Sequence, residues 1–78
     1  MYTEEMSKAF HAIEAPKNFG VSLADAGDWI NIIVDPESVM KLQQSELEDA
    51  VKYINDVKKA LEQSGAIVQI VREAVSDE

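Results

Sequence analysis

The first apolar pattern along the chain recurs at helical spacing and predicts a helix over residues 3–14. The apolar side chains that share one face of this helix are Met6, Ala9, Phe10 and Ile13. Thr3 is the expected N-cap, because its hydroxyl can accept a hydrogen bond from an amide of the first turn. Pro16 stops the helix, since proline interrupts helical hydrogen bonding.

Two apolar segments rich in strand-forming residues follow and predict β-strands over residues 19–24 and 29–34. The turn between them contains Asp25, Gly27 and Asp28, which favour a tight reversal, so the strands are expected to form an antiparallel hairpin. The alternation of the second strand gives two faces, Ile30, Ile32 and Val34 on one side and Trp29, Asn31 and Ile33 on the other.

The pair Asp35 and Pro36 predicts the start of a short helix that reaches Leu42. Aspartate is a good N-cap, and proline is favoured at the first helical position. A third strand over residues 39–42 is the alternative interpretation.

The longest helical pattern covers residues 45–63, with Ser45 and Glu48 as the expected capping box. Its apolar stripe consists of Leu47, Ala50, Val51, Ile54, Val57 and Leu61. Ser64 and Gly65 form a typical helix stop. Residues 66–71 then predict a last strand, which can continue to Ala74.

This order of elements predicts a single α+β domain over residues 1–78. It consists of a small, mostly antiparallel sheet of about three strands with one long and one or two short helices. Both faces of the strands are partly apolar, and such strands need a covering layer on each side. The long helix covers one face. Either the first helix covers the other, which gives a monomer, or a second copy packs on that face or pairs with an edge strand.

A homodimer is the expected solution, because a chain of 78 residues buries a small core. Trp29 and Ile33 are the candidate interface residues, since they lie on the face that the long helix does not cover. For Trp29 the alternative is packing in the core beside Phe19 or the first helix.

The composition of the chain argues against several classes of binding partner. The chain has 15 acidic and 7 basic residues, a net charge of −8, one histidine and no cysteine. The acidic excess argues against direct binding to nucleic acid and against anionic membranes, because both need lysine and arginine. The lack of cysteine, the acidic start and the lack of a long apolar run favour a cytoplasmic protein.

The sequence contains no arrangement typical of an enzyme. The sole histidine, His11, has only Glu14 as a nearby candidate partner, whereas catalytic zinc normally has three protein ligands. The glycines are isolated and do not form a phosphate-binding loop. We therefore expect no catalytic residue, cofactor or metal site.

The negative charge is concentrated in the first half of the chain. In the long helix acids alternate with lysines, as on an ordinary solvated face. Residues 1–40 contain seven acidic residues but only Lys8 and Lys17 as bases. The candidate partner-binding residues are Glu4, Glu5, Asp25, Asp28, Asp35 and Glu37. Spaced carboxylates of this kind can substitute for phosphates on a DNA-binding protein.

In size, acidity, lack of cysteine and lack of enzyme motifs, the chain resembles the small acidic proteins that phages make to occupy host proteins, DNA mimics among them. The resemblance implies an inhibitor that occupies the basic nucleic-acid-binding surface of a host protein. The alternative is a small structural or adaptor module that binds another protein through its apolar sheet face.

Overall fold

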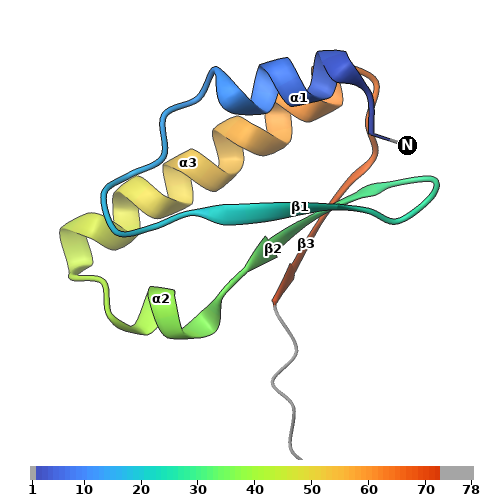
Figure 1. Ribbon diagram of the computed structural model, residues 1–78. Coiled ribbons are helices and arrows are strands. Elements are labelled where there is room, and N and C mark those ends of the chain that lie inside the picture. The colour runs from blue at the N-terminus through green and yellow to red at the C-terminus, as the bar shows by residue number, and fades with distance from the viewer. Residues whose placement is uncertain (1, 73–78) are drawn as a thin grey trace, which may run out of the picture.

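The computed structural model describes residues 2–72, which form both helices and strands (Figure 1). The elements are α1 (Glu4–His11), β1 (Val21–Asp25), β2 (Ile30–Val34), α2 (Pro36–Met40), α3 (Gln44–Gln63) and β3 (Val68–Arg72). This is the predicted α+β fold, with one long helix, two short helices and three strands among the described residues.

The sheet has the strand order β1-β2-β3 and is mixed. β1 and β2 form the predicted antiparallel hairpin, with Ala24 opposite Asn31. β3 runs parallel to β2, with Gln69 beside Asn31. The expectation of a mostly antiparallel sheet therefore holds for only one of the two strand pairs. The reason is the long connection through α2 and α3, which returns the chain to the start of β2, as a parallel neighbour requires (Figure 1).

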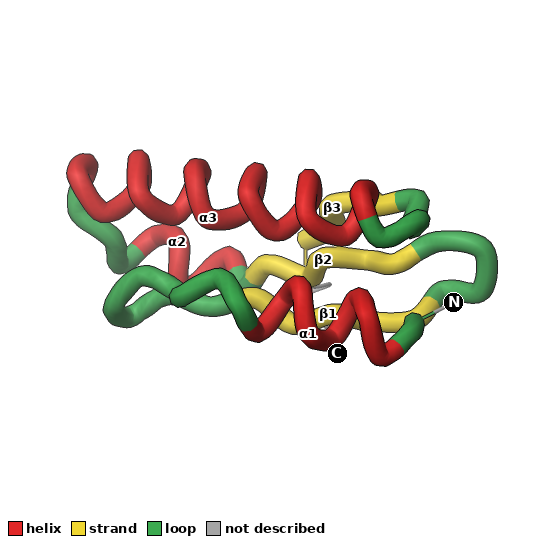
Figure 2. The backbone as a smooth tube through the Cα atoms, turned by 90° about the horizontal axis from the view of Figure 1, so that it is seen from above, coloured by secondary structure: helices red, strands yellow, loops and turns green. Residues whose placement is uncertain are grey.

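The helices α1 and α3 lie on the same side of the sheet. Figures 1 and 2 show this arrangement, with α2 at the end of β2. The prediction that the first helix could cover the second face is therefore wrong. α1 packs beside α3 instead, because their apolar stripes complete one shared core.

The core lies between these two helices and the sheet. Its buried side chains are Met6, Phe19, Ile30, Ile32, Ala50, Tyr53, Val57 and Leu61. Two positions of α3 correct the predicted stripe: Val51 is 57% exposed, whereas Tyr53, which the stripe omitted, is buried. The Tyr53 ring packs edge-on against Phe19, with ring centroids 6.3 Å apart. The helical repeat explains the difference, because Tyr53 lies three residues from Ala50 and four from Val57, on their buried face, whereas Val51 is turned by about 100° from Ala50.

Local capping defines where the first helices begin. The Thr3 hydroxyl accepts a hydrogen bond from the Met6 amide at 3.2 Å, so the predicted N-cap of α1 is confirmed. α1 ends at His11, earlier than predicted. α2 is a helix, as favoured over the alternative strand, with Asp35 as its N-cap and Pro36 as its first residue.

The start of α3 differs from the prediction. The helix begins at Gln44, and the Gln43 amide donates a hydrogen bond to the Glu46 carboxylate at 2.8 Å. The proposed box of Ser45 and Glu48 is therefore wrong, because Ser45 already lies inside the first turn. α3 ends as expected at Ser64 and Gly65, where Gly65 has a φ of 97°. The suggested continuation of the last strand to Ala74 lies outside the described residues.

Candidate interaction surfaces

A hydrogen bond between distant segments brings four of the candidate carboxylates to one end of the molecule. The Tyr2 amide donates to Asp25 Oδ2 at 3.2 Å and so holds the start of α1 against the hairpin turn. Asp25 Oδ1 accepts a second bond from the Gly27 amide at 3.0 Å, which closes the turn. Gly27 has a φ of 82°, a conformation that glycine adopts without strain. We call the group formed by Glu4, Glu5, Asp25 and Asp28 the acidic end.

The four residues of the acidic end are exposed. The Gly27 amide, and to a smaller extent the Tyr2 amide, hold the pKa of Asp25 below its ordinary value of 3.8. Glu4 and Glu5 lie in the first turn of α1, where the helix dipole favours negative charge. Within residues 2–72, neither glutamate forms an ion pair. Ion pairs within the described part of the chain therefore leave the charges of Glu4 and Glu5 available to a partner.

The other two candidate carboxylates lie at the opposite end of β2. Six residues, 29–34, separate Asp28 from Asp35, and the seven steps between the two aspartates correspond to about 23 Å of extended chain. Both Asp35 oxygens are used within the fold, since they accept bonds from the Glu37 amide at 3.1 Å and from the Ser38 hydroxyl at 3.2 Å. Asp35 thus caps α2, whereas the Glu37 side chain is exposed.

A second surface is the sheet face that α1 and α3 leave uncovered (Figures 1 and 2). Strand alternation and the pairing register place six residues on it, which we call the open face: Ser22, Ala24, Asn31, Ile33, Gln69 and Val71. None of the six is charged, although 28% of the residues in the chain are. Polar or charged side chains normally cover the solvated side of an antiparallel sheet. Half of the open face is polar, as on a solvated surface, but the lack of charge at all six positions and the half-buried Ile33 and Val71 also fit an interface.

The predicted interface residues lie on or beside this face. Ile33 is half-buried on it, and Trp29, which precedes β2, is 42% exposed. Packing of Trp29 in the core, the alternative interpretation, is therefore wrong. Ile67 is 65% exposed and lies next to Trp29, because the amide that follows Trp29 bonds to the Ile67 carbonyl at 2.8 Å. Ile67 was not among the candidate interface residues, although the strand predicted over residues 66–71 includes it.

Asn31 has an unusual environment at the centre of the open face. Its Oδ1 atom is shielded from solvent and has no hydrogen-bond partner among the described residues. A buried acceptor without a partner costs free energy, because it has lost its bonds to water. The alternation of apolar and polar residues predicted the position of Asn31 but not the burial of this oxygen.

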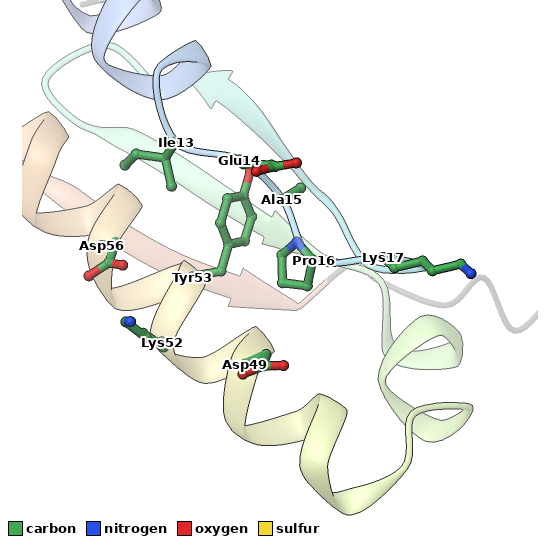
Figure 3. Close-up of a pocket in the computed structure, with 9 residues that line it drawn as sticks. All are labelled: Ile13, Glu14, Ala15, Pro16, Lys17, Asp49, Lys52, Tyr53 and Asp56. Carbon is green, nitrogen blue, oxygen red and sulfur yellow. The ribbon is translucent and has the colours of Figure 1, made fainter.

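Two hollows adjoin α3. One, of about 330 Å³, lies at the hairpin end, where its walls include Met6, Trp29 and Ile67. The other, of about 390 Å³, lies between residues 13–17 and α3, and Figure 3 shows the Tyr53 ring extending from α3 toward this segment. Its charged lining consists of Glu14, Lys17, Asp49, Lys52 and Asp56. These charges nearly balance, so this hollow lacks the strong negative character of the acidic end.

Neither hollow has a recognisable catalytic arrangement. Burial raises the pKa of Tyr53, which keeps its hydroxyl protonated over a wider pH range. His11 is exposed, and its Nδ1–H donates to the Ser7 carbonyl at 2.8 Å. Across residues 2–72, no three histidine, aspartate or glutamate side chains are grouped to hold a metal ion. The helices in that range are also too short or too polar to cross a membrane.

Comparison with known protein families, with curated proteins and with solved structures finds no match to this chain.

Proposed function

We propose that this protein is a non-enzymatic binding protein whose acidic end engages a basic surface of another protein. The observation that supports the proposal is the hydrogen bond from the Tyr2 amide to Asp25, because it joins the acidic start of α1 to the acidic hairpin. Carboxylates from segments far apart in sequence thus form one exposed group. Such a group attracts a basic partner over a distance and accelerates the encounter.

The most specific form of the proposal is a DNA mimic. A DNA-binding protein of a host cell contacts phosphates through lysine and arginine, and carboxylates at the acidic end occupy the same side chains. Binding then excludes the phosphate backbone, so inhibition is competitive. DNA mimics, which are among the small acidic phage proteins that the chain resembles, act in this way.

The decisive experiment is capture from a nuclease-treated bacterial lysate at low salt, followed by elution either with salt steps or with duplex DNA. We expect a basic DNA-binding protein that moderate salt releases, because screening weakens exposed charge pairs. Duplex DNA should release the same protein at low salt. A captured protein that resists moderate salt contradicts binding through the acidic end, and one that DNA does not displace contradicts mimicry.

A matched pair of variants tests the location of the binding surface. Glu4→Gln with Asp28→Asn removes two charges from the acidic end, and Glu48→Gln with Asp56→Asn removes two exposed charges from α3. Net charge changes equally in both. We expect the first variant to slow association several-fold and the second to have little effect, since local charge determines steering. Equal effects would show that only the net charge matters.

The open face supports the alternative function, an interaction module that binds through apolar contacts. Its supporting observation is that α1 and α3 lie on the same side of the sheet and leave Ile33 and Trp29 uncovered. Binding of this kind is insensitive to salt and is lost in Trp29→Ala, whereas binding through the acidic end persists in that variant.

A further inference from the structure

We propose that the open face is a homodimer interface, on which the open face of a second copy packs about a two-fold axis. The occupant is the same chain rather than another protein. This inference does not depend on the proposed binding function of the acidic end, because it concerns the open face, which carries no charged residue. It also selects one of the two routes to a dimer that the sequence left open, face packing or edge pairing.

Charge identifies the second copy as the occupant. Each chain carries a net charge of −8, so two copies repel each other wherever their charged surfaces meet. The six residues of the open face carry no charge, and the charged strand residues Asp25 and Arg72 lie on the other side by alternation. Two copies can therefore approach closely through their open faces without placing like charges opposite each other. A partner selected by the acidity of this chain has no charge to recognise there.

The chemistry of the open face is also self-complementary. Ile33 and Val71 provide apolar area near its centre, and both are half-buried. Asn31 lies between β1 and β3, and its carboxamide contains both a donor and an acceptor. Its Oδ1 atom is already shielded within one chain, so the apolar pair Ile33 and Val71 supplies the self-complementary contact.

The size of the open face predicts a weak dimer. Strands of five residues, spaced about 4.8 Å apart with a rise of about 3.3 Å per residue, give a footprint of roughly 14 by 17 Å. A standard interface buries about 800 Å² on each partner, considerably more than this. We therefore expect a dissociation constant on the order of 10–100 µM, at the weak end of specific association.

Face packing explains the uncovered side chains better than edge pairing does. A dimer formed through the free edge of β1 or β3 would satisfy backbone groups, but it would leave Ile33 and Val71 exposed on the extended sheet. Face packing covers both residues.

The test measures molecular mass by sedimentation equilibrium across protein concentrations, with two variants on opposite strands of the open face. Ser22→Lys on β1 and Gln69→Lys on β3 each place a lysine at an exposed position, so both variants should fold. Ser45→Lys and Gln63→Lys are the matched controls, since they make the same changes at exposed positions of α3. Circular dichroism at low concentration verifies the fold of every variant.

We expect the wild-type mass to rise from one chain to two with concentration. Each open-face variant should weaken the dimer about tenfold or more, because it buries a charge without a partner, whereas the controls should leave it unchanged. A wild-type mass of one chain throughout the range would overturn the proposal. Weakening by only one open-face variant would indicate pairing through that strand's edge, and weakening by neither would place the interface elsewhere. Both results overturn it.

Salt dependence separates this proposal from the acidic binding function. Salt screens the repulsion between two copies of charge −8, so the dimer should strengthen as ionic strength rises from about 0.01 to 0.15 M. Binding to a basic partner should weaken over the same range. A dimer that weakens with salt would overturn face packing and leave the proposal for the acidic end unaffected.

Discussion

Two valines on α3 provide the sharpest test of how the helix packs. Val57 is fully buried, whereas Val51 is 57% exposed, although the apolar stripe predicted from the sequence included both. Each valine is replaced by alanine, so the chemical change and the host helix are the same. Alanine favours the helix over valine by up to about 0.7 kcal/mol, and this gain is equal at both positions.

The expected costs follow from burial. Val57→Ala removes two buried methylene equivalents, worth about 0.8 kcal/mol each, and leaves a cavity that costs about 1 kcal/mol more. After the gain in helix propensity, the free energy of unfolding should fall by about 2 kcal/mol. At Val51 less than half of the side chain is covered and no closed cavity forms, so the net change should lie within about 0.5 kcal/mol of zero.

Urea denaturation followed by circular dichroism measures both values. A protein of this size has about 4–12 kcal/mol of stability, so a loss of 2 kcal/mol is readily resolved. It should also lower the melting temperature by roughly 10 °C. Equal losses for the two variants would refute the packing of α3, since they would require Val51 to be as buried as Val57. The measurement belongs at low protein concentration, where dimerisation does not contribute.

Three further predictions concern single groups. Asn31→Val should raise the free energy of unfolding by about 1 kcal/mol in urea denaturation, because it removes a buried oxygen that has no partner; a loss would show that this oxygen is bonded. The lowered pKa of Asp25 means that its contribution to stability is present above the ordinary value of 3.8 and is lost as pH falls through the folded value. Asp25→Asn should abolish this part of the acid dependence, and an unchanged acid unfolding curve would contradict the turn geometry. The raised pKa of Tyr53 has the opposite consequence, since stability should fall as pH rises above the unfolded value of 10.0 toward the folded value. Tyr53→Phe should remove that fall, and a variant with the same alkaline profile would place its cause elsewhere.

Local signals predicted most of the elements, because they depend on neighbouring residues. The threonine cap at Thr3, the Asp25–Gly27 turn and the Asp35–Pro36 helix start each act over a few positions, and each is confirmed. The errors concern choices between similar local signals. Ser45 and Glu48 match a capping box, but Gln43 and Glu46 form the one that the structure contains. Several positions near a helix start can satisfy the same amides, so the pattern alone does not select one.

Longer-range features could not be derived in the same way. Hydrophobic spacing identified both α1 and α3 as amphipathic, but it did not specify that they pack on the same face of the sheet. The parallel pairing of β3 likewise depends on the path of the whole connection. The open face follows directly from these two arrangements. The carboxylates of the acidic end were all predicted as candidates, but the bond between Tyr2 and Asp25, which joins the start of α1 to the hairpin, depends on the three-dimensional fold.

The two surfaces should influence each other through charge. A cationic partner at the acidic end reduces the net charge of each copy from its value of −8, so it reduces the repulsion that opposes dimerisation. Coupling between binding events is reciprocal, so dimerisation should also strengthen binding at the acidic end. A short oligo-arginine peptide is a suitable probe, and sedimentation equilibrium with and without it measures the coupling. We expect the peptide to tighten the dimer several-fold at low salt and to have no effect near 1 M salt, where the screening length is about 3 Å. If the bound peptide weakens the dimer instead, it occupies the open face, and the separation of the two surfaces is wrong.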